Sequence, residues 1–236
     1  MWSVLLTATE ATTDRLFATL SPDERDRAAR FHFNLHRHRF VLSRGLLRVL
    51  LARYLDTDPA ALVFGYGPQG KPELPGSGLC FNVSHSGNLA AHALVPDPTG
   101  SLELGIDVES IRTVSHSDAV ARRFFCPAEW QEIETLPPAE RADAFFRCWT
   151  RKEAYVKALG GGLSVPLDRF QVSLLPGHPA RLISLDGDPV RASEWSLYHL
   201  DPAEGYTGAL AVHATGFRLR ACHACHVEAS LDQLSL

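Results

Sequence analysis

The clearest hydrophobic pattern in the chain begins near residue 22. Over residues 22–55 apolar side chains recur at the spacing of one helix face, so we predict a helix there. Pro22 suits the first turn of that helix, and Ser21 before it suits the N-cap position. The apolar positions that carry the pattern are Phe40, Val41, Leu46, Leu47, Leu50, Leu51 and Leu55.

Short apolar runs separated by turns follow this helical region. Residues 65–78 are rich in glycine and proline and are predicted to form a loop. Residues 79–83 and 89–95 are predicted strands, joined by the polar turn 84–88. A further strand is predicted over residues 102–109.

The second half of the chain repeats this order of helices followed by strands. Its predicted elements are three helices and two clear strands, over residues 118–125, 127–134, 139–159, 195–200 and 207–214. The order favours the α+β class, with two lobes that are each a small sheet packed against helices. We place the N-terminal lobe at residues 1–100 and the C-terminal lobe at residues 101–236.

The composition is that of a folded protein without a strong charge bias. Hydrophobic residues make up 45% of the 236 residues and charged residues 21%, which excludes a disordered chain. The net charge of −4 disfavours a nucleic-acid-binding surface. The apolar runs are too short to cross a membrane, the first residues make a poor signal peptide, and five cysteines do not fit a disulfide framework. We therefore expect a cytoplasmic protein that binds neither nucleic acid nor membranes.

Two motif-like segments lack the context that their chemistry needs. Residues 65–71 match G-x-G-x-x-G, but Pro72 follows where a phosphate-binding loop needs the start of a helix. Residues 222–226 match the haem-attachment pattern C-x-x-C-H, but Met1 is the sole methionine and no export signal is visible. A ligand contact by the basic loop stays open, and the Cys/His-rich segment is predicted to be a solvated tail.

A pair of carboxylates lies at the end of the predicted strand 102–109. Asp107 and Glu109 are two residues apart and therefore share one face of the strand. Neighbouring carboxylates repel each other, and a hard divalent cation such as Mg²⁺ relieves that repulsion. The pair taken alone favours an ordinary solvated strand end, so a metal site needs support from further residues.

The helix predicted over residues 139–159 places charged groups beside its buried face. Glu153 and Lys157 are spaced i,i+4 on the flank of the apolar stripe, and Lys152 falls within it. Charges so close to a core need partners, so their placement favours a functional site. We predict Glu153 as a third carboxylate for the metal, with Lys152 and Lys157 facing one anionic ligand.

Arginines are concentrated in the first helical region. Residues 25–53 hold eight arginines and one acidic residue, Asp26, in a chain that is otherwise acidic. Solvated helix faces explain some of them, but the bias also attracts polyanions or an acidic protein surface. The three carboxylates, the lysine pair and the basic loop together indicate a phosphate ester that is bound with Mg²⁺ and undergoes transfer.

Five motifs in one order resemble those of the surfactin-type 4′-phosphopantetheinyl transferases. They are residues 70–72 (GKP), 81–86 (FNVSHS), 105–109 (GIDVE), 123–125 (RFF) with Glu129, and 149–157 (WTRKEAYVK). Each motif alone is weak, but order and spacing agree from about residue 21 to about residue 163. The length resembles the single-chain members of the family, which implies a monomer of two pseudo-twofold-related lobes with the active site in the cleft between them.

The resemblance also implies the reaction and its partners. The 4′-phosphopantetheine arm of coenzyme A moves to a serine of an apo acyl or peptidyl carrier protein, an acidic helical bundle, and adenosine 3′,5′-bisphosphate is released. Asp107, Glu109 and Glu153 would hold Mg²⁺, or Mn²⁺ in its place, against the pyrophosphate. Lys157 would neutralise the pyrophosphate, and Glu153 would take the serine proton directly or through water.

Contacts with coenzyme A are implied for a set of matching residues, Gly70, Lys71, Ser84, His85, Asp107 and Lys157. Three helix arginines would add to them, namely Arg27, Arg39 and Arg44. Glu24 departs from the family pattern, because some relatives have a lysine there that faces the coenzyme. The departure leaves the contacts of the 3′-phosphate open.

Two other functions stay open. A Mg²⁺-dependent phosphohydrolase acting on a nucleotide or coenzyme A ester would use the same acidic cluster with water as the nucleophile. A coenzyme A-binding adaptor would dock on acidic partners without turnover.

Overall fold

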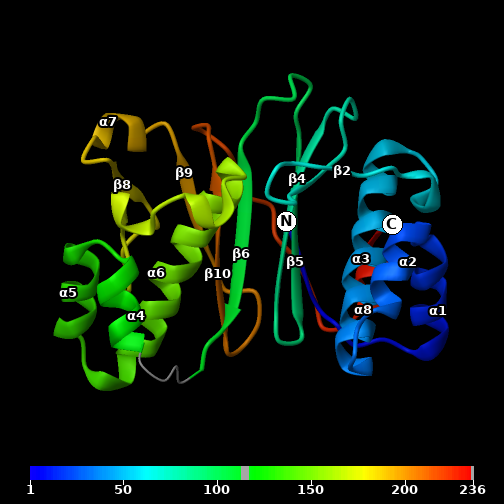
Figure 1. Ribbon diagram of the computed structural model, residues 1–236, viewed down its shortest axis with the longest axis horizontal. Coiled ribbons are helices and arrows are strands. Elements are labelled where there is room, and N and C mark those ends of the chain that lie inside the picture. Colours follow the sequence, from blue (N-terminus) through cyan, green and yellow to red (C-terminus); the bar gives the residue numbers. More distant parts are fainter. Residues whose placement is uncertain (113–116, 235–236) are drawn as a thin grey trace.

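Two small sheets stand side by side at the centre of the molecule, and helices cover the outer side of each (Figure 1). The computed structural model describes residues 1–112 and 117–234. The prediction of an α+β fold, with small sheets packed against helices, is confirmed. In the described part of the chain, no helix is both long and apolar enough to cross a membrane.

The first half of the chain builds one sheet and most of its helices. Its elements are β1 (Trp2–Leu5), α1 (Glu10–Thr19), α2 (Pro22–Ala29), α3 (Asn34–Leu55), η1 (Pro59–Ala61), β2 (Gly65–Tyr66), β3 (Pro72–Glu73), β4 (Leu79–Ser86) and β5 (Leu89–Pro96). The region predicted as one helix is therefore two helices. Glu24 on α2 bonds Arg44 on α3, whereas one continuous helix would hold them about 30 Å apart.

The second half builds the other sheet around a long helix and then returns to the first. Its elements are β6 (Leu104–Ser110), α4 (Ser117–Phe124), α5 (Pro127–Thr135), α6 (Pro138–Leu159), η2 (Gly162–Ser164), η3 (Leu167–Arg169), β7 (Phe170–Val172), β8 (Leu182–Leu185), α7 (Pro189–Ala192), β9 (Ser196–Leu200), β10 (Tyr206–Val212), β11 (Cys222–Ala224) and α8 (Val227–Leu234). Helix α6 ends at Gly160, whose φ of 67° is the left-handed cap that glycine favours.

The two main sheets have the strand orders β11-β1-β5-β4 and β6-β10-β9. Strands β4 and β5 form a hairpin in which Ser86 pairs with Leu89, so Gly87 and Asn88 alone make the turn. The predicted turn over residues 84–88 was too long. Strand β4 continues because its residues still alternate, with Ser84 and Ser86 buried and His85 exposed.

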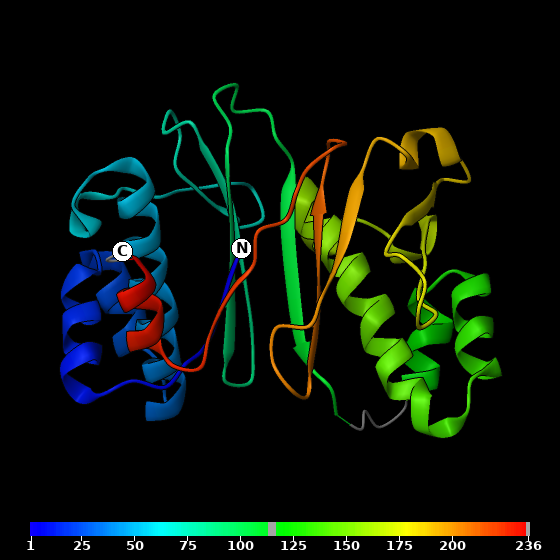
Figure 2. The ribbon, with the colours of Figure 1, turned by 180° about the vertical axis from the view of Figure 1, so that it is seen from behind.

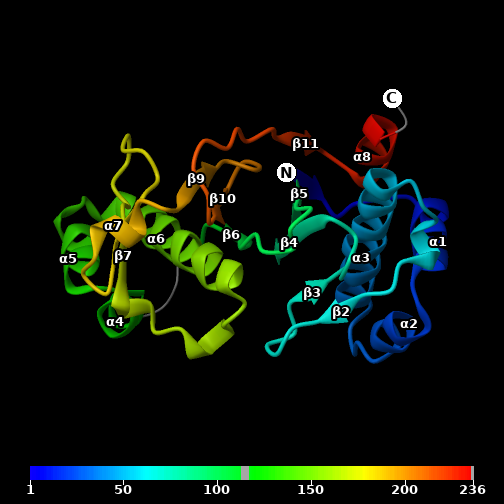
Figure 3. The same ribbon diagram turned by 90° about the horizontal axis from the view of Figure 1, so that it is seen from above.

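The segment that ends the described chain crosses back to the first sheet (Figure 2). Strand β11 pairs in parallel with β1, with Cys222 opposite Trp2, and α8 packs beside α3 (Figure 3). The Cys/His-rich segment predicted to be a solvated tail is partly ordered, since residues 222–224 form β11, while His223, Cys225 and His226 are exposed as expected. The division of the chain at residue 100 stays a prediction, and the first sheet also contains residues from beyond it.

Helix α6 lies directly on β6 because Gly105 has no side chain. A Cβ atom at Gly105 would overlap the carbonyl oxygen of Ala154, which lies on the facing side of α6. Ile106 and Val108, on the other face of β6, belong to the core between the two sheets. This close approach brings the C-terminal half of α6 against the strand that carries Asp107 and Glu109.

Candidate active site

Three side chains of β4 bind the free edge of β6. The acceptors and donors are Asn82 Oδ1 with the Ile106 N–H (2.9 Å), Ser84 Oγ with the Val108 N–H (3.2 Å), and Ser86 Oγ with the Ser110 N–H (3.2 Å). On its other side β6 pairs with β10, so these N–H groups would otherwise lack a partner. Side chains at every second position of β4 therefore join the two sheets.

Asp107 lies at this junction and is 4% exposed. Its Oδ1 accepts hydrogen bonds from Lys157 Nζ at 2.6 Å and from Ser84 Oγ at 3.0 Å. Its Oδ2 is buried without a hydrogen-bond partner. Burial raises the pKa of Asp107, and the ammonium of Lys157 opposes that shift. A buried carboxylate oxygen that lacks a donor suits a bound cation.

Glu109 lies two residues further along β6 and on the same face. Its Oε2 accepts a hydrogen bond from Ser86 Oγ at 2.6 Å and a longer one from Arg112 Nη1 at 3.5 Å. Its side chain is 24% exposed, so it is more accessible than Asp107. The shared face of the two carboxylates agrees with the sequence-based expectation.

Glu153 and Lys157 come to the same place from α6, one helical turn apart. Both are half-buried. Burial raises the pKa of Glu153, and the negative charges of Asp107 and Glu109 raise it further, while Lys157 lowers it. The structure therefore gathers three carboxylates and one ammonium group from two separate stretches of the chain.

The three carboxylates are close to one another, but they are not arranged around one common metal position. Within residues 1–112 and 117–234, no group of three or more His, Cys, Asp or Glu side chains is arranged to hold a metal ion. Lys157 is bound to one oxygen of Asp107, and Ser86 is bound to one oxygen of Glu109. The donors nevertheless fit a hard cation, because all are carboxylate oxygens and Oδ2 of Asp107 has no partner.

A cavity of about 630 Å³ opens between α2, α3 and the end of β4. Cationic and aromatic side chains are prominent in its lining, among them Arg27, Phe31, His36, Arg39, Phe40, Arg44, Tyr66 and His85. The Nε of Arg39 is buried and has no hydrogen-bond partner. Guanidinium groups beside aromatic rings suit a ligand that carries both phosphate groups and a planar ring.

The residues predicted for coenzyme A divide between this cavity and its surroundings. Gly70 and His85 line the cavity. Partial burial lowers the pKa of His85, and the positive charges of Lys157 and Arg27 lower it further, which disfavours the charged form of its imidazole. Ser84 faces Asp107 and Lys157 instead, as described above.

Lys71 binds backbone groups rather than lining the cavity. Its Nζ donates to the carbonyl oxygens of Leu104 and Ala158, each at 3.0 Å. Burial lowers the pKa of Lys71. The side chain thus joins the start of β6 to the last turn of α6, and a contact with phosphate stays a prediction.

Glu24 forms ion pairs with two arginines, a role that sequence reasoning missed. Its carboxylate is 2% exposed, with Oε1 2.6 Å from Arg44 Nε and Oε2 2.6 Å from Arg48 Nε. Arg44 also donates to the hydroxyl of Tyr66, which holds its guanidinium at the cavity wall. The acid therefore does not face a ligand, and Arg44 supplies a positive charge there. The i,i+4 spacing of Arg44 and Arg48 places both on one helix face, and this was the sequence signal that one acid could bind both.

The prediction that Lys152 faces the same ligand as Lys157 was wrong. Lys152 is fully buried, and its Nζ lies 2.8 Å from Glu129 Oε2. It also donates to the carbonyl oxygens of Leu167 and Phe170 at 2.8 and 2.6 Å. Burial raises the pKa of Glu129, and Lys152 opposes that shift. The pair joins α6 to α5 and to the start of β7.

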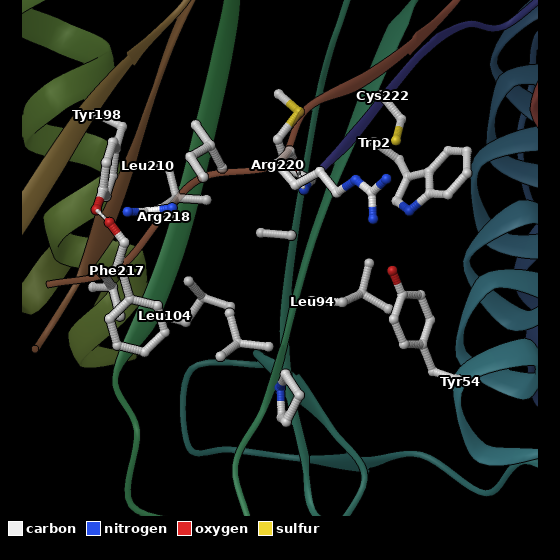
Figure 4. A pocket seen from close by; sticks show the side chains of 16 residues that line it. Trp2, Tyr54, Leu94, Leu104, Tyr198, Leu210, Phe217, Arg218, Arg220 and Cys222 are labelled. Atoms are coloured by element: carbon white, nitrogen blue, oxygen red, sulfur yellow. Dashed lines mark hydrogen bonds between the residues drawn. The ribbon is translucent and has the colours of Figure 1, made fainter.

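A second cavity, of about 280 Å³, lies on another side of the sheets. Figure 4 shows Leu94, Leu104 and Leu210 around it, with Arg218 and Arg220 on the crossing segment. None of the residues predicted for the active site is among the described residues that line this second cavity. The acidic cluster and the basic cavity therefore form the candidate site.

Comparison with known proteins identifies the family of this chain. Residues 6–96 match the family "4'-phosphopantetheinyl transferase, N-terminal", and residues 103–211 match the "4'-phosphopantetheinyl transferase superfamily". The 4′-phosphopantetheinyl transferase HetI of Nostoc sp. is 39% identical over 94% of this chain and 91% of its own. The chain belongs to the 4′-phosphopantetheinyl transferases.

Further relatives match a smaller part of this transferase. Sfp of Bacillus subtilis, also a 4′-phosphopantetheinyl transferase, is 33% identical over 68% of this chain and 69% of its own. A putative 4′-phosphopantetheinyl transferase of Synechocystis sp. is 41% identical over 64% of this chain and 61% of its own. The family predicted from the five motifs and the enzyme class, a transferase, are confirmed.

Proposed function

We propose that this transferase moves the 4′-phosphopantetheine arm of coenzyme A to a serine of an apo acyl or peptidyl carrier protein. The reaction is Mg²⁺-dependent and releases adenosine 3′,5′-bisphosphate. The observation that carries the proposal is the meeting of Asp107, Glu109, Glu153 and Lys157 on β6 and α6. Phosphoryl-type transfer depends mainly on positioning and charge neutralisation, which this set of groups provides.

Asp107, Glu109 and Glu153 are the residues that would hold the metal. A bound divalent cation would neutralise the pyrophosphate and its leaving oxygen. The unpaired Oδ2 of Asp107 supports this assignment. Lys157 adds a positive charge at the same place, since its Nζ already lies against Asp107.

Glu153 is suited to accept the proton of the attacking serine. Burial and the neighbouring carboxylates raise its pKa, which brings it closer to the pH at which a general base works well. The proton passes to the carboxylate directly or through one water molecule. Proton removal and charge neutralisation would then take place on neighbouring turns of one helix.

The basic cavity is proposed to hold the phosphorylated nucleotide of coenzyme A. Arg27, Arg39 and Arg44 would bind phosphate, and the unpaired Nε of Arg39 supports that role. Gly70, Lys71, Ser84 and His85 are retained as coenzyme contacts within this proposal. Exposed arginines of α2 and α3 would also attract an acidic carrier bundle.

Intact-mass measurement of several apo carrier proteins tests this function. Each carrier is incubated with the transferase, coenzyme A and Mg²⁺, and the expected result is a mass gain of one phosphopantetheine group. A phosphohydrolase would instead release adenosine 3′,5′-bisphosphate without any carrier and leave the carrier mass unchanged. A coenzyme A-binding adaptor would bind the coenzyme without turnover at any metal concentration.

A further inference from the structure

The bonds between β4 and β6 do more than join the two sheets. Each serine hydroxyl has one proton to donate and two lone pairs to accept with. Ser84 and Ser86 accept from the Val108 and Ser110 N–H groups, which leaves each hydroxyl proton free for a carboxylate. Ser84 gives its proton to Asp107 and Ser86 gives its proton to Glu109.

Ser86 holds Glu109 by the shorter of these two bonds. The distance from Ser86 Oγ to Glu109 Oε2 is 2.6 Å, in the range of charge-assisted hydrogen bonds. Ser86 is itself 9% exposed and is fixed by the Ser110 N–H, so its hydroxyl proton has a defined direction. Glu109 has few other restraints, since Arg112 is 3.5 Å away and 56% exposed.

We propose that Ser86 is a positioning residue that orients Glu109 as a metal-binding carboxylate. The proposal rests on the function proposed above, because it assumes a divalent cation at this site. The Ser86 bond keeps the carboxylate on the side of Asp107 and Glu153. Without it, the carboxylate is free to rotate toward Arg112, which competes for the same oxygen.

In this arrangement a residue of the first sheet orients a metal-binding carboxylate of the second sheet. Glu109 belongs to β6, but the group that aims it belongs to β4. Ser86 also lines the basic cavity, so a direct contact with the coenzyme is the alternative role. The two roles differ in what they change, which is metal affinity in one case and coenzyme affinity in the other.

Three variants separate these roles. Ser86→Ala removes the hydroxyl, and Ser86→Thr retains it in a residue that strands accept. Asn82→Ala is the matched control, because Asn82 also accepts an N–H of β6 but binds neither Asp107 nor Glu109. If Ser86→Ala does not fold, Ser86→Cys carries the same test, since a thiol fills similar space and is a weak donor.

The measurement is the dissociation constant of Mn²⁺, followed by the EPR signal of the free ion at saturating coenzyme A. Ser86→Ala is expected to weaken Mn²⁺ binding about tenfold, as substitutions behind a metal ligand do. Ser86→Thr and Asn82→Ala are expected to bind Mn²⁺ like the wild type. The KM for coenzyme A should stay unchanged in all three.

Unchanged Mn²⁺ binding by Ser86→Ala would overturn the proposal. A raised KM for coenzyme A with unchanged metal binding would assign Ser86 to the coenzyme instead. An equal loss of metal affinity in Asn82→Ala would show a general effect of the sheet junction and also refute the proposal. A wild-type protein that binds Mn²⁺ but modifies no carrier would refute the proposed function alone.

Discussion

The ammonium group of Lys157 lies 2.6 Å from Oδ1 of Asp107, so the last turns of α6 are bound to the middle of β6. The same ammonium lies 2.9 Å from Ser84 Oγ, which brings β4 into the contact. One cation thus touches a residue from each of two further elements. Lys157 binds only Oδ1 of Asp107. Oδ2 has no hydrogen-bond partner and is therefore still able to bind a cation.

Replacement of Lys157 by alanine should slow transfer severely. The variant loses a cation next to the charge that develops on the pyrophosphate, which corresponds to about a 10²- to 10³-fold loss in kcat. Steady-state transfer to an apo carrier, followed by intact mass, measures the effect. Leu159→Ala, a partly exposed position on the same helix, is the control. Turnover near the wild-type level in Lys157→Ala would remove this residue from the site.

The half-buried carboxylate of Glu153 should make the metal-free protein less stable as pH rises. Its folded-state pKa is raised, so its stabilising contribution is present below about 4.5, the ordinary pKa, and is lost as pH rises through the raised value. Glu153→Gln should therefore raise Tm by roughly 1–3 °C at pH 7 and leave it unchanged at pH 4.

Thermal unfolding in EDTA across pH 4 to 8 checks this expectation. Glu140→Gln, at the exposed start of the same helix, should show no comparable pH-dependent gain. A Glu153→Gln variant that loses stability at pH 7 would mean that the ionised carboxylate is favoured where it lies. Addition of Mg²⁺ should stabilise the wild type more than the variant.

Arg39 and Arg53 lie on one helix but should differ in their effect on coenzyme A. Arg39 lines the basic cavity with an unpaired Nε, whereas Arg53 is exposed near the other end of α3. Arg39→Ala should raise the KM for coenzyme A about tenfold, the loss expected for a hydrogen bond to a charged group. Arg53→Ala should leave KM unchanged. Equal KM values for the two variants would place the nucleotide elsewhere.

Removal of Lys152 should destabilise the fold, because its partner Glu129 is fully buried as well. Lys152→Met leaves that carboxylate without its cation, at a cost of about 3–5 kcal/mol in unfolding free energy. The control pair Arg169 and Asp186 is exposed, so Arg169→Ala should cost no more than about 0.5 kcal/mol. Urea denaturation measures both. A Lys152→Met variant that is stable but inactive would instead support the earlier prediction that Lys152 contacts the anionic ligand.

Much of the site could be predicted because its residues follow regular periods. The alternation of β6 places Asp107 and Glu109 together, and one helical turn places Glu153 next to Lys157. The contact between β6 and α6 could not be predicted in the same way, because it is a packing contact between segments far apart in the sequence. It depends on the close approach at Gly105, which local pattern alone does not reveal.

The errors arose where a polar residue has a distant partner. Ser84 and Ser86 resembled turn residues, yet they continue a strand because the N–H groups of β6 need acceptors. Lys152 resembled a ligand contact, yet its partner is Glu129 on another helix. In each case the partner is more than 20 residues away, so no local period indicates it.

The parallel pairing of Trp2 with Cys222 has a consequence for biosynthesis. Strand β1 is translated long before β11, so it gains this neighbour only after the strands of the second sheet have been translated. During elongation the nascent β1 therefore has an open edge, which a chaperone or another chain could occupy. The first sheet is complete only when β11 joins it, and such distant pairing is expected to make this folding step slow.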